Sequence, residues 1–218
     1  MNLLAGSTGF LGKEILIQLS INKLSTIALS RRHITNLPEY AEQLIIDFKN
    51  LTNLKLPRTD NLFLCLGHPL YFHNVMGIMS KKLKKDLFLV DFTYQLDIAK
   101  KAKEAGTKNI SIISAVGANT QSWNYYLKIK GELEKEIINI GFDSTNIFQP
   151  GHLRGNKHRF DIVLADMASI VFDPFLHGPL KKFRSISAKA VAKQVVNNSL
   201  NSKSGINYFH FKDFNPWR

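Results

Sequence analysis

The glycine-rich segment near the start of the chain constrains its fold more than any other feature. A short apolar stretch at residues 2–5 is followed directly by Gly6-Ser7-Thr8-Gly9-Phe10-Leu11-Gly12, and a helical pattern begins at Lys13. Such a turn between a first strand and a first helix lets the backbone approach a pyrophosphate, and the helix N-terminus offers free N–H groups to that anion. This order of strand, turn and helix predicts a dinucleotide-binding site; a purely structural turn is the alternative.

Apolar strand-like segments alternate with helical patterns along the rest of the chain. This alternation predicts a doubly wound α/β domain, a parallel sheet covered by helices on both faces. We expect one domain over residues 1–218, with a small C-terminal elaboration at about 151–218 on the substrate side. Strands are expected at residues 2–5, 24–29, 44–46, 61–66, 109–113 and 144–148, and helices at 10–20, 75–89, 94–105 and 122–140.

The residues that follow the second, third and fourth strands predict which cofactor binds. Arg31 and Arg32 stand where an acidic residue would hold a ribose 2′-hydroxyl, and guanidinium groups suit a 2′-phosphate instead. NADP(H) is therefore favoured over NAD(H). Asp47 and Phe48 are placed to hydrogen-bond and flank the adenine, and Leu66-Gly67 leaves room for the cofactor's backbone.

Three residues predict acid–base chemistry. Ser114 follows the fifth strand, and Tyr126 and Lys130 lie one turn apart on the same face of a helix. An ammonium beside a tyrosine favours the phenolate, which brings the phenol toward useful acid–base work. Lys130 would also bond the nicotinamide ribose, and Ser114 would bond a substrate carbonyl oxygen. A solvent-exposed Tyr–Lys pair is the alternative, and Tyr125 is out of register with Lys130.

Together these segments resemble the atypical short-chain dehydrogenases/reductases, and among them the Tat-interacting-protein-like branch. The resemblance covers nearly the whole chain. It implies that the glycine turn binds the pyrophosphate, that Arg31 and Arg32 face the 2′-phosphate, and that Ser114, Tyr126 and Lys130 form the catalytic set. It also implies that the loop Pro150-Gly151-His152-Leu153 flanks the nicotinamide. The matching segments are residues 6–12, Leu29-Ser30-Arg31-Arg32, Ser114-Ala115-Val116-Gly117-Ala118-Asn119, residues 126–134, Phe148-Gln149-Pro150-Gly151 and residues 179–187.

Two departures from the family pattern concern the substrate more than the cofactor. His68-Pro69 replaces the threonines that commonly follow the fourth strand, and Gln149 replaces an arginine. The segment 68–89 is longer than usual and could be a substrate lid, a dimer contact or a protein-binding element. The histidines at 68, 73 and 152 lack metal-ligand spacing, so we expect no metal.

Composition narrows the partners and the compartment. Cys65 is the single cysteine, which excludes an internal disulfide, and no signal peptide or membrane-spanning run is recognised. We therefore expect a cytoplasmic protein without membrane binding. The net charge of +12 lacks any accompanying nucleic-acid motif, and its lysines lie in helices with solvated faces, so specific nucleic-acid binding is not expected. A monomer or weak homodimer is expected.

Three function classes follow from these patterns. The first is an NADP-dependent oxidoreductase that acts on a small carbonyl or alcohol and takes a small-molecule substrate. The second is an NADPH-binding regulatory or assembly protein with little or no turnover, since fold alone does not decide activity. The third is a sugar-nucleotide epimerase or dehydratase, which the short region after Pro150 disfavours.

Overall fold

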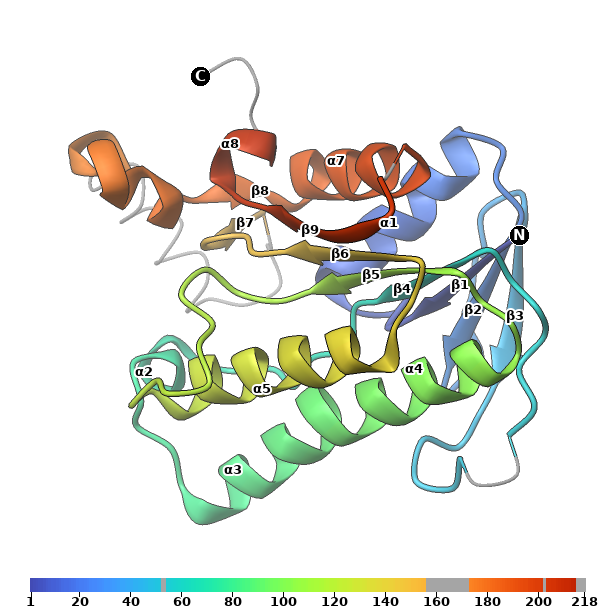
Figure 1. Ribbon diagram of the computed structural model, residues 1–218, viewed down its shortest axis with the longest axis horizontal. Coiled ribbons are helices and arrows are strands. Elements are labelled where there is room, and N and C mark those ends of the chain that lie inside the picture. Colours follow the sequence, from blue (N-terminus) through green and yellow to red (C-terminus); the bar gives the residue numbers. More distant parts are fainter. Residues whose placement is uncertain (52–53, 156–172, 202, 215–218) are drawn as a thin grey trace.

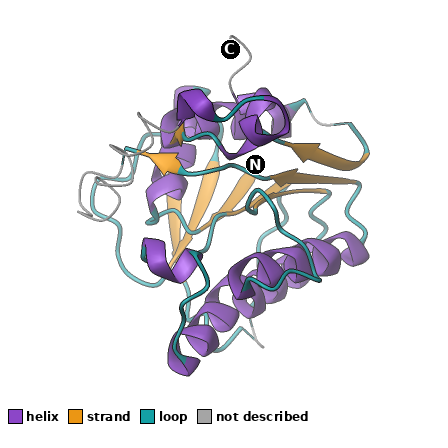
Figure 2. Cartoon of the chain, turned by 90° about the vertical axis from the view of Figure 1, so that its left-hand side faces the viewer, coloured by secondary structure: helices purple, strands orange, loops and turns teal. Residues whose placement is uncertain are grey.

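The computed structural model describes residues 1–51, 54–155, 173–201 and 203–214. Within these ranges the chain forms three layers, with a central sheet between two layers of helices (Figure 1). The view turned by 90° shows the same arrangement, with helices above and below the strands (Figure 2). The doubly wound α/β fold predicted from the sequence is confirmed.

The central sheet has seven strands in the order β3-β2-β1-β4-β5-β6-β9, and every neighbouring pair is parallel. The order reverses direction between β1 and β4, so the crossovers from these two strands leave on opposite sides. Such a switch point opens a crevice at the carboxyl ends of the strands. The strands are β1 (Asn2–Ala5), β2 (Thr26–Ser30), β3 (Ala41–Ile45), β4 (Asn61–Leu64), β5 (Asn109–Ile113), β6 (Ser144–Phe148) and β9 (Gly205–Phe209).

Two groups of helices cover the sheet. The upper layer in Figure 1 holds α1 (Phe10–Ile21), α7 (Ala188–Leu200) and α8 (Phe211–Phe214), and α1 packs against α7. The lower layer holds α3 (Lys81–Phe88), the π-helical segment η1 (Leu89–Thr93), α4 (Tyr94–Glu104) and α5 (Tyr125–Ile140). Short elements complete the described chain: α2 (Phe72–Val75), η2 (Asp173–Phe175), η3 (Gly178–Phe183), β7 (Leu153–Arg154) and β8 (Ile186–Ser187).

Alternating side chains of the strands feed two separate cores. In β1, Leu3 and Ala5 join the core beneath the sheet, whereas Leu4 joins the core above it. Successive strand residues point to opposite faces, so a strand covered on both sides must be apolar throughout. Because β1 is covered on both faces, all of its residues are buried.

Two elements differ from the sequence-based expectations. The strand β9 adds a seventh member to the sheet and pairs with β6, but three of its five residues are exposed because it lies at the sheet edge. The single helix expected at 75–89 is instead the short α2 followed by α3, which continues through η1 into α4. The segment at 151–218 forms the parallel pair β7–β8, α7, β9 and α8, and residues 156–172 of this expected elaboration lie outside the described residues.

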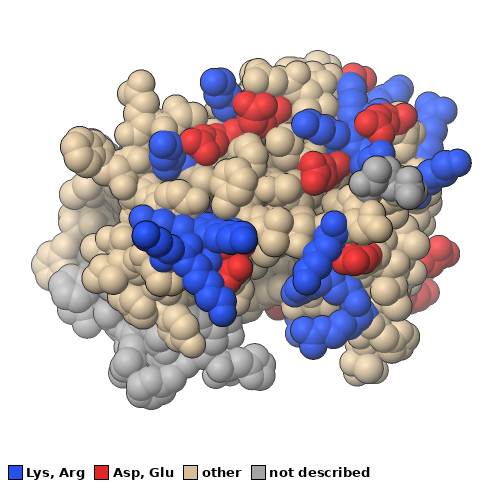
Figure 3. Space-filling model, turned by 90° about the horizontal axis from the view of Figure 1, so that it is seen from below, with Lys and Arg blue, Asp and Glu red and all other residues tan. Residues whose placement is uncertain are grey.

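The charge on the lower helical face is divided rather than continuous. Seen from below, Lys and Arg side chains lie in several groups, with Asp and Glu side chains between them (Figure 3). Across the described part of the chain, no helix combines the length and the apolar character needed to cross a membrane.

Candidate functional site

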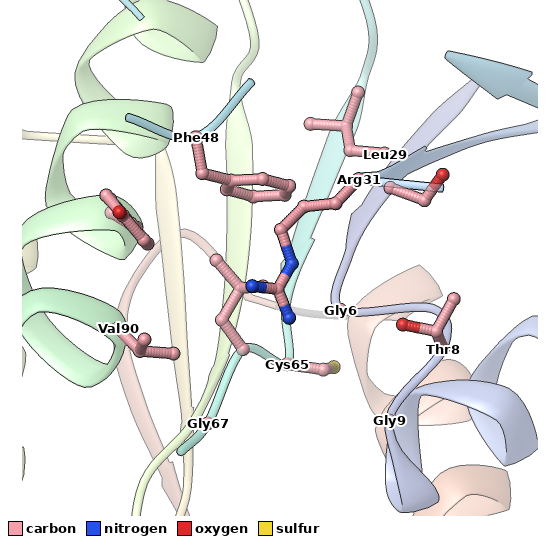
Figure 4. A pocket seen from close by; sticks show the side chains of 12 residues that line it. Gly6, Thr8, Gly9, Leu29, Arg31, Phe48, Cys65, Gly67 and Val90 are labelled. Carbon is pink, nitrogen blue, oxygen red and sulfur yellow. The ribbon is translucent and has the colours of Figure 1, made fainter. Parts of the chain in front are cut away.

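A pocket of about 190 Å³ lies at the switch point of the sheet. Its walls come from the turn after β1, the end of β2, the segments after β3 and β4, and the place where η1 joins α4 (Figure 4). This is the place at which doubly wound sheets bind nucleotides. The lining residues are Gly6, Thr8, Gly9, Leu29, Ser30, Arg31, Phe48, Cys65, Leu66, Gly67, Val90 and Tyr94.

The glycine turn is tight enough to require glycine at two positions. Gly6 has a positive φ of 92°, and a Cβ there would lie 2.5 Å from the carbonyl carbon of Cys65. A Cβ on Gly12 would lie 2.0 Å from the carbonyl oxygen of Gly6, so α1 can approach β1 only with glycine at this position. Gly9 lines the pocket and is the N-cap of α1, so the helix end whose first N–H groups lack partners within the helix lies beside the cavity. The remaining motif residues Ser7, Phe10 and Leu11 support the turn: Ser7 and Leu11 are buried, and Phe10 packs against the upper core.

Replacing Gly12 by alanine is expected to destabilise the protein and weaken nucleotide binding. The added methyl group would collide with backbone atoms that cannot move independently, and overpacking of this kind costs about 1–3 kcal/mol. Thermal unfolding measures the loss of stability. Gly67→Ala is the matched control, because its Cβ would lie no closer than 3.7 Å to a neighbour, and its unfolding temperature should change little. Equal unfolding temperatures for the two variants would contradict this account of the turn.

The two arginines after β2 are placed differently. The side chain of Arg31 extends into the pocket, and its guanidinium lies between Phe48 and Cys65 (Figure 4). Both arginines are exposed, but Arg32 does not line the pocket. Its carbonyl accepts hydrogen bonds from Ser30 Oγ at 2.8 Å and from Gln43 Nε2 at 2.6 Å, and these fix the turn that directs Arg31. The structure therefore favours Arg31 as the cation that faces a bound anion.

Some of the other residues predicted to contact the cofactor line the pocket, and others do not. Phe48, which is buried, lines the pocket. Leu66 and Gly67 line it too. Asp47 is exposed and lies outside the pocket lining, and its Oδ1 accepts a hydrogen bond from the N–H of Lys49 at 2.9 Å. The carboxylate of Asp47 therefore orders the turn after β3 in this structure.

The three predicted chemical residues gather at the carboxyl end of β5. Lys130 is buried, and its Nζ lies 5.8 Å from the centroid of the Tyr126 ring. The same Nζ donates to the carbonyl of Ile113, the last residue of β5, at 3.4 Å. Ser114 is the next residue along, and it is also buried. Asn124 caps α5 by accepting from the N–H groups of Tyr126 and Leu127, which fixes where this helix begins.

A buried aspartate, which the sequence reasoning missed, is the ion-pair partner of Lys130. Asp91 lies in η1, and its Oδ1 is 2.9 Å from Lys130 Nζ, with both side chains at most 5% exposed. Its signal in the sequence is a lone carboxylate inside the apolar run Phe88-Leu89-Val90-Asp91-Phe92. A charge in such a run must find a buried partner of opposite sign, because an isolated buried charge is too costly.

A second missed carboxylate supports Ser114. Glu134 lies one turn beyond Lys130 on α5, and its Oε1 accepts hydrogen bonds from Ser114 Oγ and from Gln149 Nε2, the latter at 2.9 Å. Burial raises the pKa of Glu134. The two hydrogen bonds from Ser114 and Gln149 oppose this rise, and so does the positive charge of the nearby Lys130. The spacing of Tyr126, Lys130 and Glu134, four residues apart each time, could have indicated one continuous functional face.

The pKa of Tyr126 departs from the sequence-based expectation. Burial raises this pKa above the ordinary value, and the neighbouring Lys130 lowers it only in part. Asp91 raises it further, because its negative charge disfavours a phenolate. The Lys130 ammonium therefore offsets only part of the effect of burial, and the pKa of Tyr126 stays above its ordinary value.

The loop at 150–153 is held by the C-terminal segment. The carbonyl of Pro150 accepts from the N–H of Val116 at 3.1 Å, and Leu153 pairs with Ile186 in the β7–β8 sheet. A Cβ on Gly151 would lie 2.7 Å from the carbonyl oxygen of Arg184, so this glycine permits close packing. His152 contributes its carbonyl to the N–H of Ile186 at 2.9 Å. Neither His152 nor its neighbours line the pocket at the switch point.

Over residues 1–51, 54–155, 173–201 and 203–214, no group of three or more His, Cys, Asp or Glu side chains is arranged to hold a metal ion. The described residues combine a glycine turn and a cation at the pocket with a Ser–Tyr–Lys group outside the pocket lining, in which Ser114 and Lys130 are buried. These groups can together position a dinucleotide and move a proton.

Solved structures share this fold over most of the chain. A short chain dehydrogenase family protein from Francisella tularensis subsp. tularensis SCHU S4 is 17% identical, with a TM-score of 0.69 and 95% of each chain covered. ElxO with NADP bound is 14% identical, with a TM-score of 0.70, and the match covers 95% of this chain and 96% of that one. Human epimerase family protein SDR39U1 with NADPH is 14% identical, with a TM-score of 0.64, over 96% and 73%. The chain shares with these proteins an α/β Rossmann-like fold with a seven-stranded parallel sheet.

Sequence relatives give a narrower assignment, although no protein-family model matches the chain. Protein FMP52, mitochondrial, of Lodderomyces elongisporus is 31% identical over 168 residues, which are 72% of this chain and 68% of the relative. The chain belongs to the FMP52 family. The matches to the relatives of Candida albicans (46% identical over 68 residues, 31% of this chain) and Coccidioides immitis (34% over 116 residues, 50% of this chain) span only 30% and 46% of those proteins.

The names of these relatives contradict the expected cytoplasmic location, because each is called mitochondrial. The expectation was wrong for a physical reason. A single cysteine excludes a disulfide framework, but it does not distinguish one reducing compartment from another.

Proposed function

We propose that the chain is an NADP-dependent oxidoreductase that reduces a small carbonyl, or oxidises the corresponding alcohol, with Ser114, Tyr126 and Lys130 as its chemical residues. The observation that carries this proposal is the buried Lys130, held within 5.8 Å of the Tyr126 ring and hydrogen-bonded to the end of the strand that presents Ser114. A burial this costly for an ammonium is typical of a functional site rather than of a surface pair.

Three features of the pocket support a phosphorylated dinucleotide as its ligand. Gly6 and Gly9 form one wall of the pocket, and Gly9, as the N-cap of α1, places the first turn of this helix beside it. Phe48 offers an apolar face for a base, and Arg31 offers a guanidinium for a phosphate. NADPH, when bound, would supply the hydride. Pro150, Gly151, His152 and Leu153 would flank the nicotinamide, as the family resemblance implies.

Each chemical residue would have a separate task. The phenol of Tyr126 would give its proton to the carbonyl oxygen, and Lys130 would hold a ribose hydroxyl. Ser114 would contact the substrate oxygen. Because its hydroxyl donates to Glu134 in this structure, Ser114 can accept from an alcohol product directly and must rotate its proton away from Glu134 to bond a carbonyl substrate.

Within the short-chain dehydrogenases/reductases, we propose a relation to the Tat-interacting-protein-like branch, on the motifs that suggested it. The partner would be a small molecule, with the protein acting as a monomer or weak homodimer. The FMP52 relatives and the structural neighbours leave the substrate open. An NADPH-binding regulatory protein with no turnover is the competing function, and a screen of aldehydes and ketones distinguishes it. NADPH oxidation in that screen supports the oxidoreductase, whereas a silent screen with NADPH bound supports the regulator.

Replacing Arg31 by alanine is expected to remove most of the preference for NADPH over NADH. Each lost charge-assisted hydrogen bond costs about 1.5–3 kcal/mol, which is roughly tenfold or more in affinity. Titration calorimetry with both cofactors measures the change. Arg32→Ala is the matched control, because this neighbour is exposed outside the pocket lining, and it should keep most of the preference. A larger loss in Arg32→Ala than in Arg31→Ala would contradict the placement of the phosphate.

A further inference from the structure

The carboxylate of Asp91 is buried in η1, where the continuous helix formed by α3, η1 and α4 changes from α-helical to π-helical winding. Asp91 is the central residue of the π-helical segment Leu89–Thr93, and it is 2% exposed. A π turn inserts an extra residue into the helical repeat, and such turns often occur at functional sites. The side-chain amide of Gln95 donates to the carbonyl of Asp91 at 2.9 Å and supports the backbone there.

Both oxygens of this carboxylate are bound. Oδ1 lies 2.9 Å from Lys130 Nζ, and Oδ2 accepts the backbone N–H of His68 at 2.7 Å. The aspartate therefore joins three elements: η1, α5 and the segment that follows β4.

The ion pair between Lys130 and Asp91 changes the electrostatic effect of the ammonium on the Tyr126 phenol. A lone ammonium near the phenol would act on it as a full positive charge. With Asp91 at 2.9 Å from Nζ, the negative charge offsets part of the effect that the ammonium, 5.8 Å from the tyrosine ring, has on the phenol. Burial lowers the pKa of Lys130, but the effects of Asp91 and Tyr126 are larger together, and the pKa is raised. Lys130 therefore stays charged beside the carboxylate of Asp91.

We propose that Asp91 is a positioning residue that holds and neutralises the Lys130 ammonium, so that Tyr126 stays protonated and the site is set to donate a proton in carbonyl reduction rather than to accept one from an alcohol. This inference rests on the proposed function for its chemical meaning. The charge relation itself belongs to the cofactor-free protein and is measurable without any substrate.

Two other titratable groups face Lys130 among the described residues. Cys65 lies at the end of β4, and burial raises the pKa of its thiol to about 12, so it is neutral at physiological pH. Glu134 lies one turn away on α5, where its Oε1 accepts from Ser114 and Gln149. Of the carboxylates, Asp91 is the one with a direct ion pair to Lys130.

The test is the ionisation of Tyr126 in cofactor-free protein, followed by the ultraviolet absorbance of tyrosinate during an alkaline titration. The chain has 6 tyrosines, so each titration is compared with that of the same protein carrying Tyr126→Phe. Asp91→Asn keeps an acceptor for the N–H of His68 but removes the charge. We expect the Tyr126 midpoint to fall by about one pH unit or more in this variant. Circular dichroism over the same pH range identifies the folded interval.

Two further variants decide the cause of the shift. Asp97→Asn removes a carboxylate from the same helix more than one turn away and should leave the Tyr126 midpoint in place. Adding Lys130→Met to Asp91→Asn should abolish the fall, because the effect acts through the ammonium. A midpoint in Asp91→Asn that is unchanged or raised, or an absence of Tyr126 ionisation while that variant is folded, would overturn the proposal. So would a fall that persists without Lys130. Failure of the carbonyl screen would leave this result untouched.

Discussion

Replacing Lys130 by methionine is expected to lower the free energy of unfolding by about 3–5 kcal/mol, because it leaves the buried carboxylate of Asp91 without its counter-charge. Chemical denaturation at neutral pH measures this loss. The pH matters because the pKa of Lys130 is raised in the folded protein. The stability that Lys130 contributes is therefore present at neutral pH and is lost only as the pH rises through that raised value.

Lys128→Met is the matched control for this prediction. Lys128 lies on the same helix, and its exposed side chain makes a loose ion pair with Glu132 at 3.9 Å. Pairs of this kind contribute at most about 1 kcal/mol. The combined variant Asp91→Asn with Lys130→Met should recover part of the lost stability, since no unpaired charge is then buried. A Lys130→Met protein as stable as the wild type would contradict the buried ion pair.

Replacing Tyr126 by phenylalanine is expected to abolish carbonyl reduction while NADPH affinity stays nearly unchanged. Only the phenolic oxygen is removed, so the proton path is lost, and the pocket that would hold the nucleotide is unaltered. Steady-state rates with a substrate found in the screen, together with NADPH titrations, separate the two effects. Tyr125→Phe is the control, because its hydroxyl is directed to the carbonyl of Lys84 at 3.4 Å, and it should retain activity. Turnover that survives Tyr126→Phe would refute the mechanism.

The sequence order of most strands and helices was predictable, because the residue pattern of each segment agrees with its place in the sheet. Gly6, Gly9 and Gly12 mark a turn whose steric demands the structure displays directly. The strands β1, β2, β4, β5 and β6 are short, mostly buried runs, as is typical of parallel sheets. Helices separate them except between β2 and β4, where the partly exposed β3 follows β2 without a helix. The strand β9 was missed because it lies at the sheet edge and alternates between exposed and partly buried residues, so its apolar pattern is weak.

The chemical site was only partly predictable. Tyr126 and Lys130 were accessible from their spacing on one helix, and Ser114 from its position after a strand. Asp91 was not, because its partner is 39 positions away and the π-helical segment that presents it leaves no clear periodic signal. The two arginines after β2 were equivalent in sequence, and the hydrogen bonds of Gln43 to the turn distinguish them in space.

Titration calorimetry of the unmodified chain with NADPH and NADH tests the central claim most directly. The account predicts one NADPH site in each chain and an affinity for NADPH at least about tenfold higher than for NADH, since the Arg31 guanidinium would contact the 2′-phosphate. Equal affinities for the two cofactors, or no binding of either, would contradict it.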